Sequence, residues 1–253
     1  MDIFLGALAW LADPAHWTGA DGIPTRLIEH LTVSGLSLLV AALVALPLGL
    51  YIGHTGRGAL LAVNVANVGR AVPSYAVLVM ILPISLRFFP QTGGLDFIPT
   101  FGAMTLLAIP PIVINAYAGL REVDRDLIEA AKGMGMRDLQ LLRKVEVPLA
   151  LPVVLGGLRT ASVQVIATAT LGAIVALGGL GRYIIDGIAR REYDRMVAGV
   201  ILVAALAIAV ELLFVVFQRV IVSPGLRRAR AGADRPGDRA LLMPGGDPGA
   251  LAG

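Results

Sequence analysis

The chain has 253 residues, 57% of them hydrophobic, and its mean hydropathy is +0.79. This composition is far more apolar than that of a soluble domain and predicts a multi-pass membrane protein with lipid around it. The chain contains no cysteine, which excludes disulfides, thiol catalysis and cysteine-ligated metals. The three histidines are scattered outside the apolar runs, so we expect no metal site. The net charge of +3 does not indicate nucleic acid, because many basic residues fall in loops between apolar runs.

Residues 1–25 are expected to form an external segment ahead of the first span. Their first dozen residues, MDIFLGALAWLA, are apolar but too few to cross a bilayer. They also lack the positively charged start of a signal peptide. We therefore predict an interfacial helix that ends near Asp13 and Pro14.

The apolar runs indicate an all-α membrane protein with five core transmembrane helices in a domain over residues 26–222. A bilayer core needs about 20 apolar residues per helix. Five runs meet that length, and they cover residues 31–53, 58–86, 97–120, 147–176 and 196–218. The second run is interrupted by Arg70 and Pro73. An odd number of spans places the two ends of this domain on opposite sides of the membrane.

Loop charge sets the expected orientation. The loop at 121–148 and the tail at 223–253 together carry more of the arginines and lysines than the loops on the other side. By the positive-inside rule, the N-terminus is predicted outside and the C-terminus in the cytoplasm. The tail is rich in glycine, proline, alanine and arginine, so we predict that it is disordered.

A charged segment, EAAKGMGMRDLQLLRKVEVP, lies between the third and fourth spans and includes Pro148 as its last residue. Acidic residues precede it, as is favourable at a helix N-terminus. Ala130 and Ala131 offer a small-residue surface that another protein can approach closely. Gly133 and Gly135 can end the helix and permit a sharp turn, and Pro148 fits the first turn of the next helix. An ordinary amphipathic surface helix is the alternative interpretation.

The spacing of these residues resembles the EAA loop of binding-protein-dependent ABC importer permeases. In that family the loop is a cytoplasmic helix-turn-helix that docks into a groove on the ATPase subunit. The resemblance assigns ATPase coupling to Glu129, Ala130, Ala131, Gly135 and Pro148.

Further segments extend the resemblance over roughly residues 30–220. They read AVPSYAVLVMILP, INAYAGLR, VPLALPVVLGGLRTA and ATLGAIVALGGLG. Together they resemble permease subunits of glycine betaine, carnitine and choline importers, the osmoprotectant branch. This implies a methionine-importer-like permease fold. It also implies three partners, namely a cytoplasmic ABC ATPase dimer, a second permease, identical or paralogous, and an extracytoplasmic substrate-binding protein.

The chain has no GxxxxGK[ST] motif, so it carries no nucleotide site of its own, and ATP is expected on the partner ATPase. The GGLG at 178–181 lacks the context of a phosphate loop and reads better as a helix end and turn on the outer face. No cofactor is expected in this chain.

Two charged residues lie within the predicted spans at similar depth. Arg159 is about eleven residues past Pro148, and Glu211 is about eight residues before Arg219, at about 1.5 Å of rise per residue. Because charges inside a membrane are costly unless paired, we expect an ion pair, with a structural role favoured over a direct role in transport.

The other polar residues of interest are Asn115, Gln164, Thr168 and Thr170. The resemblance places the translocation path between the spans that flank the EAA loop, so these four are pathway candidates. Their alternative role is to bond a neighbouring helix.

Two other functions remain open from the sequence. A permease of the same fold could carry another small solute such as methionine. An intramembrane enzyme or lone channel is disfavoured, because the spans carry one glutamate, two arginines and no histidine. We therefore expect a cell-membrane permease and no enzyme activity.

Overall fold

The computed structural model describes residues 2–91, 95 and 97–221, and every regular element in them is a helix. The predicted tail at 223–253 lies outside the described residues. The described residues up to Phe214 form one compact unit. The last residues of α10, from Val215 on, belong to a second unit.

The helices follow the order α1 (Asp2–Ala12), η1 (Pro14–Trp17), α2 (Ile23–Thr55), α3 (Ala59–Ala71), α4 (Ser74–Phe88), α5 (Phe97–Arg121), α6 (Arg125–Gly133), α7 (Asp138–Leu141), η2 (Leu142–Glu146), α8 (Val147–Ala169), η3 (Thr170–Val175), α9 (Gly181–Arg190) and α10 (Tyr193–Ile221). Helices η1 and η3 are 3₁₀-helices and η2 is a π-helix. The N-terminal helix α1 ends one residue before Asp13, whose carboxylate accepts the Ala15 N–H at 2.9 Å and so begins η1.

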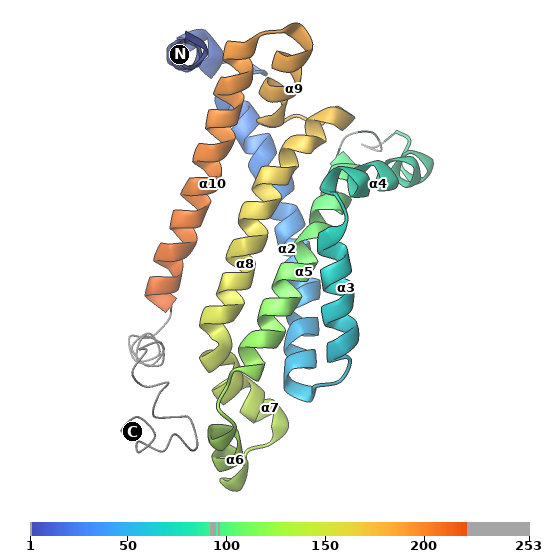
Figure 1. Cartoon of the computed structure of the whole chain (residues 1–253), viewed down its shortest axis with the longest axis vertical. Helices are drawn as coiled ribbons and strands as arrows, with labels where there is room; N and C mark the ends of the chain where they lie inside the picture. Colours follow the sequence, from blue (N-terminus) through green and yellow to red (C-terminus); the bar gives the residue numbers. More distant parts are fainter. Residues whose placement is uncertain (1, 92–94, 96, 222–253) are drawn as a thin grey trace, which may run out of the picture. The chain divides into compact units, whose positions relative to one another are not determined.

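Four helices are long and apolar enough to cross a membrane: α2, α5, the continuous run Asp138–Val175, and α10 (Figure 1). The pair α3 and α4 makes a fifth if it is counted as one broken span. The five predicted spans therefore correspond to these elements, although α2 begins well before residue 31.

The second predicted span is bent by 94° between α3 and α4. The break lies at Val72, which has φ −73° and ψ 126°, an extended conformation. The following Pro73 disfavours the α-helical conformation at Val72, and α4 resumes at Ser74. Pro73 thus accounts for a break that the apolar pattern alone would not reveal.

Helix α5 contacts α2, α3, α4 and α8. Small residues allow its close approach to two of them. A Cβ placed on Gly157 of α8 would lie 2.6 Å from the Asn115 Cβ of α5, and one on Gly49 of α2 would lie 2.7 Å from the Ala116 Cβ. Backbones that meet through glycine and alanine pack tightly without large side chains, as is common between transmembrane helices.

Helix α8 does not begin after a break, although the sequence suggested that Pro148 would start a new helix. Pro148 is its second residue, but Asp138–Val175 is one continuous helix. The five residues before α8 form the π-helix η2, in which the Val147 N–H bonds the Leu142 carbonyl. We infer that this wider turn eases the clash that a proline ring makes with an α-helical backbone.

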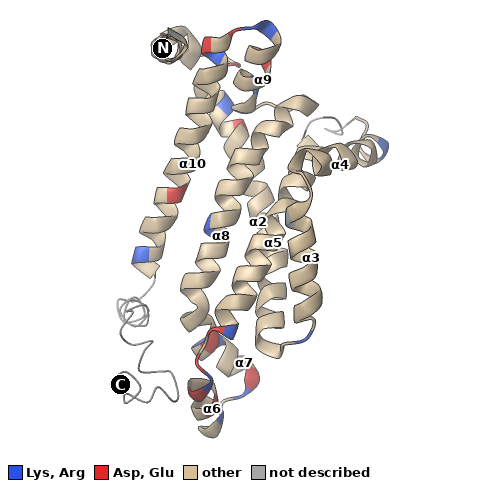
Figure 2. Ribbon diagram, viewed as in Figure 1, with Lys and Arg blue, Asp and Glu red and all other residues tan. Residues whose placement is uncertain are grey.

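Charged residues gather at the two ends of the helical unit, and few of them lie in the middle of its helices (Figure 2). One end, formed by α6, α7 and η2, is here called the loop end. The other, formed by α9 and the start of α2, is called the α9 end. The candidate site residues lie at the loop end, along the run from α8 into η3, and at Asn115 of α5 and Glu211 of α10.

Candidate coupling and transport sites

The loop end is a helical hairpin whose ends are fixed by local hydrogen bonds. The Asp124 carboxylate accepts the Asp126 N–H at 2.9 Å and caps α6. After α6, Gly135 takes a positive φ of 83°, and its N–H bonds the Lys132 carbonyl at 2.9 Å. A residue with a side chain is strained in that conformation, so glycine determines the turn here.

Four of the five predicted coupling residues face outward. Glu129, Ala130, Gly135 and Pro148 are exposed, whereas Ala131 is only 3% exposed and packs inside the chain. Both alanines had been expected on the approachable surface. Consecutive helical residues point about 100° apart, so one alanine can face outward while its neighbour packs inward.

A histidine and a glutamate meet beside this hairpin. His54 Nδ1 lies 2.6 Å from Glu146 Oε2, and Glu146 is only 5% exposed. His54 is near the end of α2, and Glu146 is the last residue of η2. They line a polar cavity whose other lining residues are Gly53, Thr55, Arg57, Leu120, Arg121, Val123, Arg125, Ile128, Glu129, Lys132, Asp138 and Leu141. The sequence did not single out either member of the pair, since 92 residues separate them.

Arg159 of α8 and Glu211 of α10 form an ion pair. Each side chain keeps 35% of its surface exposed, so the pair is only partly buried within this chain. An open cavity of about 630 Å³ adjoins it, and Asn115 and Gln164 also line that cavity. The structure thus brings together two pathway candidates and the charged pair.

Another cavity along α8, of about 330 Å³, lies at the break between α3 and α4. It is lined by Gln164 and Thr168 of α8, with Leu107 and residues of the α3–α4 junction. The Thr168 hydroxyl donates to the Gln164 carbonyl at 2.7 Å. Gln164 is therefore shared by both cavities.

Asn115 and Thr170, like Thr168, each donate a hydrogen bond to a nearby backbone carbonyl. The Asn115 side-chain amide donates to the Pro111 carbonyl at 2.8 Å. The Thr170 hydroxyl donates to the Ala167 carbonyl at 2.8 Å, and Thr170 lines neither of the two cavities on α8. The structure therefore separates Thr170 from the other three candidates.

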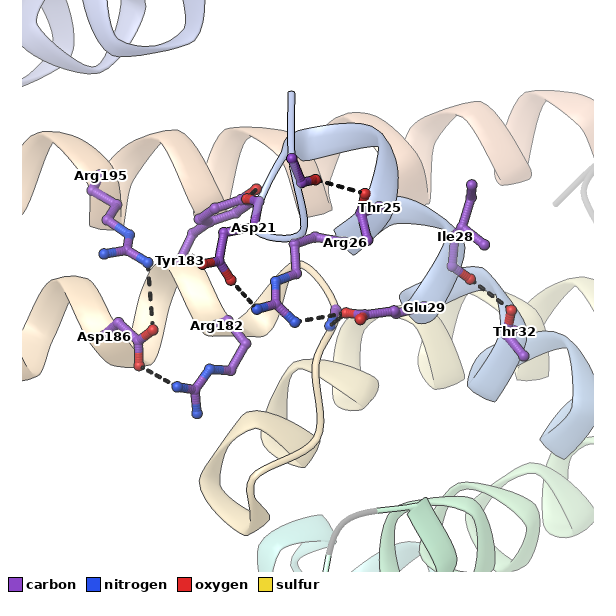
Figure 3. A network of polar contacts seen from close by, with 12 residues as sticks. Asp21, Thr25, Arg26, Ile28, Glu29, Thr32, Arg182, Tyr183, Asp186 and Arg195 are labelled. Atoms are coloured by element: carbon purple, nitrogen blue, oxygen red, sulfur yellow. Dashed lines mark hydrogen bonds and ion pairs between the residues drawn. The ribbon is translucent and has the colours of Figure 1, made fainter. Parts of the chain in front are cut away.

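A network of polar contacts ties the start of α2 to the turn before α9 (Figure 3). The Glu29 carboxylate accepts the Arg26 guanidinium at 2.8 Å and the Gly179 N–H at 2.7 Å. Arg26 also pairs with Asp21, and the Tyr183 hydroxyl donates to the Asp21 carbonyl at 2.6 Å. Burial raises the pKa of Tyr183, which keeps its hydroxyl protonated and able to donate.

The glycines of the GGLG segment make this network sterically feasible. A Cβ on Gly178 would lie 2.0 Å from the Glu29 carboxylate, and one on Gly181 would lie 2.3 Å from the Thr170 carbonyl oxygen. The segment is a turn between η3 and α9, as the sequence predicted in preference to a phosphate loop.

Residues 45–228 match the family described as binding-protein-dependent transport system inner membrane component. The chain belongs to this family. As a permease it is a transport component of the inner membrane and not an enzyme. The family implies an ATPase and a substrate-binding protein as partners.

Curated relatives cover most of the permease. It is 32% identical to the choline transport system permease protein OpuBB of Bacillus subtilis, over 81% of this chain and 91% of that protein. It is 33% identical to the carnitine transport permease protein OpuCB of Listeria monocytogenes, with the same coverage. It is 32% identical to the osmoprotectant import permease protein OsmW of Salmonella typhimurium, over 85% of this chain and 100% of that protein.

Solved structures share the fold of the permease. The MetNI methionine ABC transporter, in an inward-facing conformation, superposes with a TM-score of 0.70 at 22% identity, over 84% of this chain and 100% of that chain. An amino acid ABC transporter with histidines gives a TM-score of 0.66 at 20% identity, over 85% and 97% of the two chains. The methionine-importer-like fold expected from the sequence is thereby confirmed.

Proposed function

We propose that the permease imports osmoprotectants, small zwitterions or quaternary amines such as glycine betaine, choline and carnitine. The observation that carries this proposal is the set of relatives above 30% identity over most of their length, which are named for choline, carnitine and osmoprotectant transport. The methionine and amino acid transporters are similar at 20–22% identity and support the fold alone.

In the proposed complex, two permeases surround a central path and two ATPases bind the loop end. The N-terminus and the α9 end face outward, where the substrate-binding protein delivers solute, and the loop end faces the cytoplasm. The excess of arginine and lysine in the loop at 121–148 and in the tail supports this orientation. ATP binding and hydrolysis move α6 and switch access to the path from one side to the other.

The exposed residues Glu129, Ala130 and Gly135 of the loop end, with Pro148 at the start of α8, supply the proposed contact with the ATPase. Ala131 contributes by packing α6 against the rest of the chain. Along the path, we assign solute contact to Gln164 first, because it lines both cavities on α8. Asn115 and Thr168 each line one of these cavities.

Solute competition in a reconstituted system tests the substrate class. The permease is assembled with its ATPase and substrate-binding protein in vesicles, and uptake of labelled choline is measured with unlabelled betaine, carnitine or methionine in excess. We expect betaine or carnitine to compete and methionine to have no effect. Competition by methionine alone would assign the permease to amino acid import. Subunit masses of the purified complex decide whether the second permease is identical or a paralogue.

A further inference from the structure

The contact between His54 and Glu146 joins two parts of the chain that the backbone does not connect. Glu146 is the last residue of η2, which continues directly into α8, so the loop and α8 are joined through the backbone. Helix α2 ends at Thr55 and has no such covalent link to the loop. The 2.6 Å contact between the two side chains supplies a non-covalent link in its place.

The burial of Glu146 gives this contact its strength. A buried carboxylate without a partner is costly, and a charge-assisted hydrogen bond to a buried group is worth more than one in water. The side chains of Glu146 and His54 are 6% and 18% exposed. The cavity beside them holds further charged side chains, from Arg57, Arg121, Arg125, Glu129, Lys132 and Asp138.

Glu146 is also the last residue of a π-helix. A π turn has a wider backbone than an α-helix and often occurs at functional sites. Here the π turn lies between the hairpin of α6 and α7 and helix α8. A loosely held backbone at this point would absorb part of the motion of the hairpin before it reached α8. The hydrogen bond to α2 fixes the last residue of that turn.

We propose that His54 and Glu146 are positioning residues that hold the loop end against α2, so that ATPase-driven motion of α6 reaches α2 as well as α8. This inference rests on the proposed function. It adds a requirement that the family resemblance does not contain, namely that a histidine at the end of α2 is needed for efficient coupling.

The test is the ratio of solute taken up to ATP hydrolysed by the reconstituted complex. Glu146→Gln and His54→Gln keep the approximate size of each side chain and remove the charge-assisted contact. We expect the ratio to fall about tenfold in each, the factor that corresponds to ~1.4 kcal/mol. The swapped variant, His54→Glu with Glu146→His, restores the contact and should recover most of the ratio.

A matched control is Glu192→Gln, which removes a carboxylate from an exposed ion pair with Arg195 beside α9, away from the loop end. Its ratio should equal that of the wild type. A purely structural role for the pair would lower the amount of assembled complex while uptake per ATP stayed constant.

The outcomes separate this inference from the proposed function. If the wild type takes up none of the osmoprotectants, the proposed function fails. If the wild type transports and the glutamine variants keep a normal ratio, or the swapped pair recovers nothing, the positioning role is wrong. Should Glu146→Gln fail to assemble, His54→Gln decides alone, because the His54 side chain is the more exposed partner.

Discussion

At the scale of single residues, the charged pair on α8 and α10 shows how a membrane helix tolerates ionised groups. Arg159 and Glu211 neutralise one another and remain 35% exposed beside an open cavity. Partial exposure lowers the desolvation cost of each charge and also weakens their attraction. The pair is therefore both a contact between helices and part of a cavity wall.

Alanine at either position of this pair should destabilise the permease. The remaining charge loses its partner, which is worth roughly 1.5–3 kcal/mol for a hydrogen bond to a charged group and less where water reaches it. We expect lower expression and a lower unfolding midpoint in Arg159→Ala and in Glu211→Ala, with partial recovery in the double variant. A double variant no better than the worse single variant would argue against the pairing.

Gln164 should affect transport without affecting assembly. Gln164→Ala removes the amide shared by both cavities on α8, and losing one hydrogen bond of about 1 kcal/mol corresponds to a roughly fivefold drop in receptor-dependent uptake. Thr170→Ala is the comparison, because Thr170 lines neither of these cavities. Equal effects of the two substitutions, measured at matched protein amounts, would contradict the assignment of Gln164 to the path.

At the scale of elements, the turn after α6 depends on one glycine. Gly135 has φ 83°, and a Cβ there would meet nothing within 4 Å, so any penalty comes from the backbone or from a partner protein. We expect Gly135→Ala to cost about 1 kcal/mol through strain and to lower ATPase co-purification. Gly135→Asp adds charge to the exposed surface and should abolish uptake while membrane insertion is kept.

Gly133 provides the control for this turn. It is also exposed with nothing within 4 Å of a Cβ, but it lies in α6 without a positive φ. Gly133→Ala should leave ATPase co-purification unchanged. Similar losses from both alanine variants would show that the positive φ is not the cause.

Two adjacent glycines of α8 should respond oppositely to alanine. A Cβ on Gly157 would lie 2.6 Å from the Asn115 Cβ and 3.0 Å from the Pro111 carbonyl, whereas one on Gly156 meets nothing within 4 Å. Gly157→Ala should destabilise the permease by roughly 1–3 kcal/mol through overpacking. Gly156→Ala should stabilise it by about 0.5–1 kcal/mol through helix propensity. Thermal unfolding of the purified variants measures both, and a stable Gly157→Ala would refute the close contact.

At the scale of the whole molecule, solute recognition should reside mainly outside this chain. A path that bound its solute tightly would retain it, so release to the cytoplasm requires weak binding. We expect the purified permease–ATPase complex, without its substrate-binding protein, to bind betaine, choline or carnitine more weakly than micromolar. Equilibrium binding measures this, and micromolar or tighter affinity would contradict the division of labour.

The spans and the helical hairpin at the loop end could be predicted because they depend on local patterns. Apolar runs set the helices, Pro73 indicated the break, and Gly135 indicated the turn. The contacts between distant residues could not be predicted in the same way. His54 and Glu146 are 92 residues apart and Glu29 and Gly179 are 150 apart, so their meeting depends on how α2 packs against the other helices. Arg159 and Glu211 were an exception, since only equal depth in the membrane was needed to suggest a pair.

The close contact at Gly157 falls near the middle of the continuous helix Asp138–Val175, with 19 residues on one side and 18 on the other. A rod of 38 residues is roughly 57 Å long at ~1.5 Å per residue. If such a rod tilts about its midpoint, its two tips travel equal distances in opposite directions. Displacing the tip at the loop end in one direction would then move the far tip by the same amount in the opposite direction. A close contact near the midpoint would therefore make opening at one end of the helix and closing at the other a single movement.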